Sequence, residues 1–170
     1  MGSLLASVAT VVIAGLAFVG GGFAARPAAP DDPGLLSGSA GVFDVAGRLD
    51  SAAEFRAGYR WERHGKVLRP LVAAMVTSDG SSFACGGIAY DLPLGRHFIL
   101  TPSFAPGLYA RGGGPDLGHV VEFRSQIALD FRLPRGARIG LSFSHMSNAH
   151  LGATNPGVEA LVLNYSKSLH

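Results

Sequence analysis

The sequence predicts an all-β fold, an eight-stranded antiparallel transmembrane β-barrel. Charged residues make up only 15% of the 170-residue chain and 24 residues are glycine, which disfavours a helical bundle and favours a turn-rich β structure. Beyond residue 35 the chain divides into eight strand-like runs separated by turn signals. The clearest runs alternate apolar and polar residues with a period of two, as strands with two different faces do.

An uncharged apolar segment opens the chain. From Gly2 to Ala25 there is no charged side chain, and small residues close the run, so residues 1–25 are predicted to be a cleaved signal peptide. An uncleaved membrane helix is the alternative, because the run is long and no Lys or Arg precedes it. The Pro- and Asp-rich residues 26–34 are expected to form a disordered leader. Residues 35–170 would then form one barrel domain.

Most of the predicted strands have the ~9 to 11 residues that a tilted strand needs to cross a bilayer. No stretch with helical periodicity competes for the central region. An even number of strands allows the barrel to close with both chain termini on the same side of the membrane. The predicted strands cover residues 35–45, 52–62, 67–77, 81–90, 96–109, 119–132, 137–147 and 157–167.

Alternation separates an apolar face from a face of mixed charge. In the second run Phe55 and Trp61 share one face, whereas Glu54 and Arg56 share the other. Charges of both signs can pair inside a narrow eight-stranded barrel while the apolar face meets lipid. A soluble barrel would place the same two faces the other way round, and alternation alone does not choose between them.

Three further observations favour the membrane barrel. The export signal sends the chain out of the cytoplasm. Longer connections alternate with tight turns, as outer loops alternate with periplasmic turns. Four aromatic residues fall near the periplasmic ends of strands, where a membrane barrel has an aromatic girdle: Tyr59, Trp61, Phe131 and Tyr165. Three prolines within predicted strands count against it, because proline fits poorly in a paired ladder: Pro70, Pro102 and Pro106.

Residues of serine-hydrolase chemistry lie at the end of the seventh run and the start of the eighth. His145 and Ser147 continue the outward parity of the seventh run, and Glu159 has the outward parity of the eighth. Imidazole would take the Ser147 proton as that oxygen attacks an ester carbonyl, and Glu159 would bind the other ring nitrogen. Asn155 and Asn148 are candidate donors to the oxyanion. From spacing alone, a non-catalytic polar rim at the ends of these strands is as good an interpretation as a catalytic site.

A longer set of residues over 137–167 carries a family likeness. It consists of His145-Met146-Ser147-Asn148-Ala149, the Asn155-Pro156-Gly157 turn, Glu159 twelve residues after the serine, and Asn164-Tyr165. These residues resemble the lipid A 3-O-deacylase family of outer-membrane barrels known as PagL. The resemblance implies an esterase that removes the acyl chain ester-linked at the 3 position of lipid A, with no metal and no other cofactor.

The resemblance also implies a role for each site residue. Ser147 matches the family's nucleophile, His145 its base and Glu159 its orienting acid, and Asn155 matches an asparagine of the oxyanion hole. Lipid A in lipopolysaccharide and the lipids of the bacterial outer membrane are then the expected partners, with a homodimer left open. The chain ends in Ser168-Leu169-His170, whereas many outer-membrane barrels end in an aromatic residue.

Other function classes find little support. A net charge of +2 without a basic cluster disfavours nucleic-acid binding. Cys85 has no disulfide partner and no metal-ligand spacing, so we interpret it as a small apolar strand residue. Two alternatives to the esterase remain. One is a non-enzymatic outer-membrane barrel with a structural or adhesion role, and the other is a soluble exported barrel that binds an apolar ligand inside.

Overall fold

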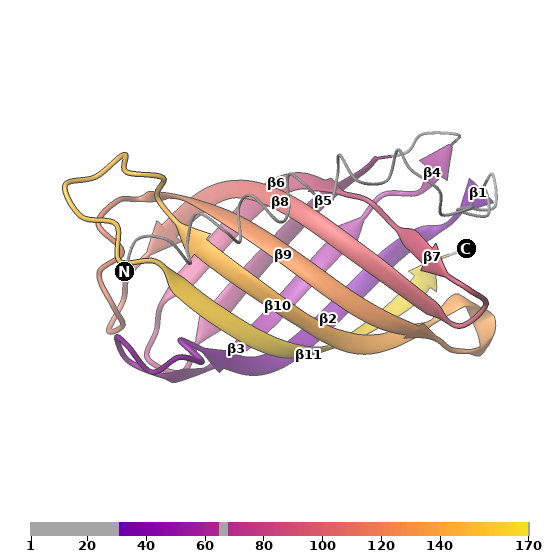
Figure 1. Cartoon of the computed structure of the whole chain (residues 1–170), viewed down its shortest axis with the longest axis horizontal. Helices are drawn as coiled ribbons and strands as arrows, with labels where there is room; N and C mark the ends of the chain where they lie inside the picture. Colours follow the sequence, from indigo (N-terminus) through magenta and orange to yellow (C-terminus); the bar gives the residue numbers. More distant parts are fainter. Residues whose placement is uncertain (1–30, 65–67, 170) are drawn as a thin grey trace.

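Eight long antiparallel strands close into a barrel whose axis follows the longest dimension of the molecule (Figure 1). In this computed structural model, residues 31–64 and 68–169 are described. Within those ranges no helix is both long and apolar enough to cross a membrane. The long strands are β2 (Gly34–Phe43), β3 (Ala52–Arg60), β5 (Arg69–Thr77), β6 (Ser82–Ala89), β8 (Phe98–Ala110), β9 (Val121–Arg132), β10 (Arg138–Ser147) and β11 (Val158–Leu169).

The ring closes where β11 pairs with β2, from Ala160 opposite Phe43 to Leu169 opposite Gly34. The short strand β7 (Leu92–Leu94) pairs with β8 beyond the end of β6, and a 3₁₀ turn, η1 (Pro134–Gly136), joins β9 to β10. Each of the eight predicted runs overlaps one long strand. The predicted fold class, an eight-stranded antiparallel barrel, is therefore confirmed.

The three prolines that counted against a barrel all lie inside strands. Pro70 in β5 pairs opposite Ile88, and Pro102 in β8 pairs opposite Ile127. At Pro106 the β6–β8 ladder is interrupted between the Cys85–Gly107 and Ile88–Phe104 pairs. Proline has no N–H to donate, so this local gap in the ladder is where the chain accommodates it.

The start of the barrel differs from the prediction. The predicted signal peptide, residues 1–25, and residues 26–30 of the predicted leader lie outside the described residues. Within the rest of that leader, β1 (Asp31–Asp32) pairs with β4 (Arg63–His64), and Gly34 opens β2 one residue before the predicted start of the barrel domain. The Pro33 carbonyl also accepts a hydrogen bond from Arg69 Nη2 at 2.6 Å, which fixes this segment to the barrel.

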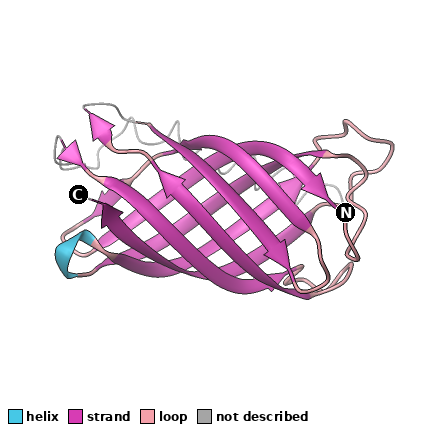
Figure 2. Cartoon of the chain, turned by 180° about the vertical axis from the view of Figure 1, so that it is seen from behind, coloured by secondary structure: helices cyan, strands magenta, loops and turns pink. Residues whose placement is uncertain are grey.

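The two ends of the barrel differ in their connections (Figure 2). We call the end that carries residues 44–51, 78–81, 111–120 and 148–157 the loop end, and the end that carries η1 and the last residues of β11 the turn end. The predicted girdle residues lie toward the turn end, where Trp61 and Tyr165 are exposed and the Tyr59 and Trp61 rings are 5.0 Å apart.

The outer face of the barrel is mainly apolar, and most charged side chains of its strands point inside. Phe55 and Leu163 each keep 54% of their surface exposed, whereas Glu54 and Arg69 are fully buried. A barrel in water would bury the apolar face and expose the charges. The observed polarity is that of a barrel surrounded by lipid, and it disfavours the soluble exported barrel.

The interior is built in two layers. Near the turn end, Asp91 accepts bonds from Arg60 and Arg69, each at 3.0 Å, and from Arg138 at 2.8 Å. Toward the loop end, a cluster of mainly apolar side chains shares the lumen with the buried charges of Glu54, Arg56 and Arg124. Charges of both signs were predicted to pair inside the barrel, and such pairs occur in both halves, but near the loop end apolar side chains lie among them. The apolar cluster includes Phe43, Met75, Phe83, Tyr109, Leu117, Met146 and Val158.

Candidate active site

His145 and Glu159 face each other across the β10–β11 ladder, on the outer face of the barrel near the loop end. They are direct register partners, and His145 Nδ1 lies 3.1 Å from Glu159 Oε1. An ionised carboxylate only accepts hydrogen bonds, so Nδ1 donates and Nε2 keeps its lone pair. The side chains are 19% and 14% exposed, which leaves the pair reachable from outside the barrel.

Ser147 is the last residue of β10 and lies two residues beyond His145 on the same face. With a rise of about 3.4 Å per residue, the two Cα atoms are about 7 Å apart, within reach of each other's side chains. Among the described residues no hydrogen bond joins the Ser147 hydroxyl to the imidazole; such bonds often tighten only when substrate binds. The structure thus gathers the three predicted residues on one outer patch.

The two predicted oxyanion donors differ in their environment. Asn155 Oδ1 accepts the Asn148 backbone N–H at 3.0 Å, and its Nδ2 lies 3.5 Å from His150 Nδ1, which leaves at least one of its two amide hydrogens for another acceptor. Asn148 is fully buried, and its Nδ2 donates to the carbonyls of Leu117 and Thr154, each at 2.8 Å. Both amide hydrogens of Asn148 are therefore used inside the loop. This geometry favours Asn155 over Asn148 as an oxyanion donor.

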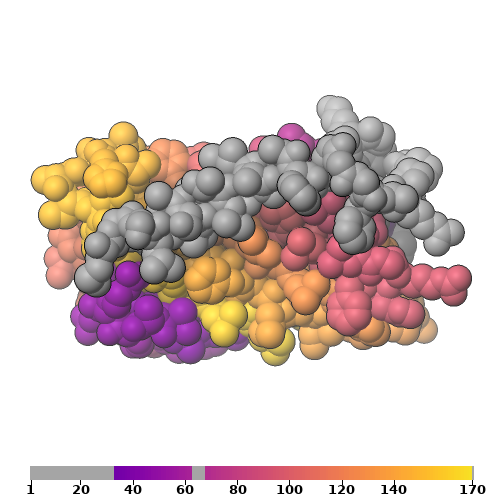
Figure 3. Space-filling model, viewed as in Figure 1, coloured from indigo at the N-terminus to yellow at the C-terminus, as the bar shows by residue number. Residues whose placement is uncertain are grey.

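The loop that carries Asn155 is tied to its neighbour. In the space-filling view, residues 148–157 form a projection at one end of the barrel (Figure 3). Gly118 in the 111–120 loop lies so close to Thr154 that an added Cβ would come within 2.2 Å of the Thr154 carbonyl oxygen. The Asn148 bond to Leu117 crosses the same contact. These contacts hold the loop above the His145–Glu159 pair.

Gly157 lies against the edge of the imidazole that carries Nε2. Its φ of +67° is in the left-handed region, and an added Cβ would lie 2.9 Å from His145 Cε1 and 3.4 Å from Nε2. Glycine is therefore required here both by the backbone conformation and by the close approach to the ring. The Asn155-Pro156-Gly157 turn, noted in the sequence as part of a family likeness, helps to fix the position of the His145 ring.

Gly157→Ala is expected to lower the predicted ester hydrolysis by roughly 10²-fold, because a displacement of the ring by about 1 Å misaligns Nε2 with the Ser147 hydroxyl. Gly80→Ala is the matched control: Gly80 also has a positive φ, +89°, but its nearest neighbour to an added Cβ is 3.8 Å away. Rates of the two variants and of the wild type on a soluble ester would be compared. Equal losses in both variants would mean that loop strain, and not the ring contact, is responsible.

Arg48 belongs to this site but was not predicted from the sequence. It lies in the loop between β2 and β3, and its Nη2 donates to Glu159 Oε2, the oxygen that His145 does not use. Its neighbours Gly47 and Leu49 do not distinguish it from an ordinary surface arginine. The only signal that could have pointed to it is the closure of β11 onto β2, which brings residues 44–51 beside Glu159.

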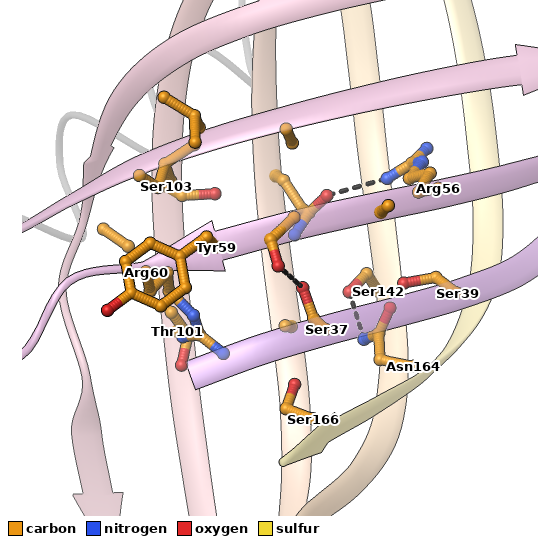
Figure 4. A pocket seen from close by; sticks show the side chains of 18 of the residues that line it. Ser37, Ser39, Arg56, Tyr59, Arg60, Thr101, Ser103, Ser142, Asn164 and Ser166 are labelled. Atoms are coloured by element: carbon orange, nitrogen blue, oxygen red, sulfur yellow. Dashed lines mark hydrogen bonds between the residues drawn. The ribbon is translucent and has the colours of Figure 1, made fainter. Parts of the chain in front are cut away.

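A polar cavity inside the barrel is separate from this site (Figure 4). Arg56 donates to Gln126 Oε1 at 2.8 Å, Ser37 donates to the Gly58 carbonyl at 3.1 Å, and Asn164 donates to Ser142. Neither Ser147 nor the His145–Glu159 pair lines it. No group of three or more His, Cys, Asp or Glu that could hold a metal ion occurs within 31–64 and 68–169.

Comparisons with known proteins agree with the fold. The family model described as lipid A 3-O-deacylase (PagL) matches residues 52–168. A curated relative, the lipid A deacylase PagL of Bordetella bronchiseptica (strain ATCC BAA-588 / NCTC 13252 / RB50), is 28% identical over 123 residues. That alignment covers 71% of this chain and 63% of the relative, so the chain spans less than two thirds of the relative's length.

Two solved structures share the architecture. The crystal structure of the outer membrane enzyme PagL superposes with a TM-score of 0.62 at 18% identity, covering 79% of this chain and 99% of that one. A structure from the de novo design of transmembrane β-barrels superposes with a TM-score of 0.57 at 7% identity, covering 81% and 96%. At these identities the two structures establish the barrel fold alone.

Proposed function

The chain belongs to the lipid A 3-O-deacylase (PagL) family, and from that membership and the outward-facing His145–Glu159 pair we propose that it is an outer-membrane esterase. The proposed reaction is hydrolysis of the acyl chain ester-linked at the 3 position of lipid A in lipopolysaccharide. The bacterial outer membrane is the proposed location, since the outer face of the barrel is mainly apolar and most charged side chains of its strands point inside.

In the proposed mechanism Ser147 is the nucleophile. Its oxygen attacks the ester carbonyl while His145 Nε2 takes the hydroxyl proton. Glu159 accepts the Nδ1–H bond and stabilises the imidazolium that forms. The bond from the acyl carbon to the sugar oxygen then breaks, and the imidazolium returns the proton to that oxygen. Water, deprotonated by the same imidazole, then attacks the acyl-enzyme. The bond from the acyl carbon to the Ser147 oxygen breaks, the imidazolium returns its proton to that oxygen, and the fatty acid leaves.

We propose Asn155 as a donor to the oxyanion, with its Nδ2 facing the charge that develops on the carbonyl oxygen. The side chain of Asn148 is fully buried and instead holds the loop in place through its two hydrogen bonds to backbone carbonyls. Ser147, His145 and Glu159 all come from one chain, so this mechanism does not require a homodimer.

The observation that carries the proposal is the position of the His145–Glu159 pair on the outer wall at one end of the barrel. The scissile ester of lipid A lies where the sugar headgroup meets the acyl chains. A membrane lipid can bring that ester to the outer wall without leaving the bilayer, whereas it could not enter the packed lumen. A non-enzymatic structural or adhesion barrel would have no use for a hydrogen-bonded imidazole and carboxylate at this depth.

Mass analysis of purified lipid A after incubation with the protein in detergent tests the proposal. We expect the loss of one 3-hydroxyacyl group from lipid A that carries the 3-O-linked chain. Lipid A that lacks this chain is the matched substrate, and its mass should stay unchanged. Unchanged mass of both substrates would contradict the esterase assignment, and loss of a chain from both would contradict the 3-O position.

A further inference from the structure

We propose that Arg48 is a positioning residue of the active site, which holds the Glu159 carboxylate in the orientation that His145 requires. This inference rests on the proposed function. Arg48 Nη2 donates to Oε2 while His145 Nδ1 donates to Oε1, so each carboxylate oxygen has its own partner. A carboxylate with one partner can turn about its own axis. One held at both oxygens cannot turn without breaking a charge-assisted hydrogen bond.

The loop between β2 and β3 is built around a buried aspartate that fixes its shape. Asp44 is fully buried and has a φ of +53°. Its Oδ2 accepts the Leu49 backbone N–H at 2.6 Å, and its carbonyl accepts Gly47 N–H and Ser51 Oγ, each at 2.8 Å. These bonds span residues 44–51 and enclose Arg48. The guanidinium is therefore presented by an ordered loop.

The same loop is attached to Glu159 through the backbone. Val45 N–H donates to the Glu159 carbonyl at 2.9 Å, directly after the last β2–β11 ladder pair, Phe43 with Ala160. The chain thus leaves β2 bonded to the main chain of Glu159 and returns three residues later to bond its side chain. This double attachment is what distinguishes Arg48 from a surface arginine that meets a carboxylate by chance.

The size of the effect is limited by solvent. The Arg48 side chain is 47% exposed and that of Glu159 only 14%, so water screens the pair from one side. The positive charge of Arg48 also opposes the imidazolium, which offsets part of the gain from orientation. We therefore expect loss of the guanidinium to lower kcat by about fivefold, well short of the effect of losing a triad member.

The experiment compares Arg48→Gln and Arg48→Lys with Arg111→Gln as the matched control. Arg111 is an exposed arginine of the 111–120 loop whose ion-pair partner, at 3.6 Å, is Asp116. Rates would be measured on a neutral p-nitrophenyl ester in micelles and on lipid A. We expect Arg48→Gln to lower kcat about fivefold on both substrates with KM unchanged, Arg48→Lys to recover most of the rate, and Arg111→Gln to match the wild type.

Two outcomes would overturn the proposal. A loss confined to lipid A and expressed in KM would make Arg48 a contact for an anionic group of the substrate. Wild-type rates of Arg48→Gln on both esters would make the ion pair incidental. Asp44→Ala supplies a second variant, because loosening the loop should lower kcat in the same direction while Arg48 is still present.

A readout without turnover separates this inference from the proposed function. In a Ser147→Ala background, the His145 Nδ1–H proton can be followed by NMR for its exchange with water. We expect that exchange to be faster by about fivefold in Arg48→Gln, because a freely turning carboxylate protects the proton less. Equal exchange would refute the role of Arg48. If the wild type hydrolysed neither ester, the proposed function would fail and this measurement alone would decide the matter.

Discussion

Ser147→Ala is expected to lower the rate of the proposed lipid A 3-O-deacylation by about 10⁴-fold or more, because the proposed acyl-enzyme forms on the hydroxyl oxygen that this change removes. The hydroxyl is the only part of the side chain removed. The His145–Glu159 hydrogen bond lies two residues away along the strand and does not involve the Ser147 hydroxyl. Quantitative mass analysis of the released fatty acid would give the residual rate.

Ser144→Ala is the matched control for this prediction. Ser144 lies in the same strand, but it is 3% exposed, faces the lumen and accepts a hydrogen bond from Arg56 Nη2 at 2.9 Å. It should retain wild-type activity. A residual rate in Ser147→Ala near that of Ser144→Ala would exclude Ser147 as the nucleophile. Adding His145→Ala to Ser147→Ala should cost little more, since members of a triad act as a unit.

The outward orientation of the site could be predicted because the strand pleat has a period of two. Phe143 is 42% exposed, and the same parity carries His145 and Ser147 to the outer face, as the sequence indicated. The pairing of His145 with Glu159 also follows from sequence, because β10 and β11 are consecutive antiparallel strands. Only their register remained to be fixed, and a ten-residue connection allows several.

The remaining parts of the site depend on contacts between distant segments. Arg48 reaches Glu159 because the first and last strands of the barrel close on each other, and no local pattern encodes that closure. The position of Gly157 against the imidazole depends on the path of the loop above it. Residue type alone made Asn148 as good a candidate donor as Asn155, yet its contacts with Leu117 and Thr154 give it a different part in the loop.

The apolar layer in the lumen was missed for a similar reason. Alternation shows which residues face inward but not how far along the axis each one lies. Phe43, Phe83 and Met146 come from strands far apart in sequence, and they meet only once the strands have tilted and closed. The charged layer, by contrast, could be predicted, because inward-facing residues such as Arg60 in β3 and Arg138 in β10 lie near the same end of their strands.

Asp91→Ala is expected to destabilise the folded barrel by about 3 to 5 kcal/mol, the usual cost of removing one partner from a buried ion-pair network. The Asp91 side chain is 2% exposed, and it accepts bonds from Arg60, Arg69 and Arg138 and from the Thr101 hydroxyl at 2.8 Å. Its loss removes the carboxylate that the three arginines share and leaves their like charges to repel one another. The folded fraction in increasing urea, followed by the heat-dependent gel shift of the barrel, would measure the change.

Asp116→Ala is the matched control, because Asp116 also pairs with an arginine, but its side chain is 69% exposed and the distance to Arg111 is 3.6 Å. It should cost less than about 1 kcal/mol. Asp91→Asn keeps the size of the side chain and removes only its charge, so it should lose most of the same stability. If Asp91→Asn instead unfolded at the same urea concentration as the wild type, hydrogen bonding and not charge would hold this end of the lumen together. The charged layer would then be a consequence of the fold and not one of its causes.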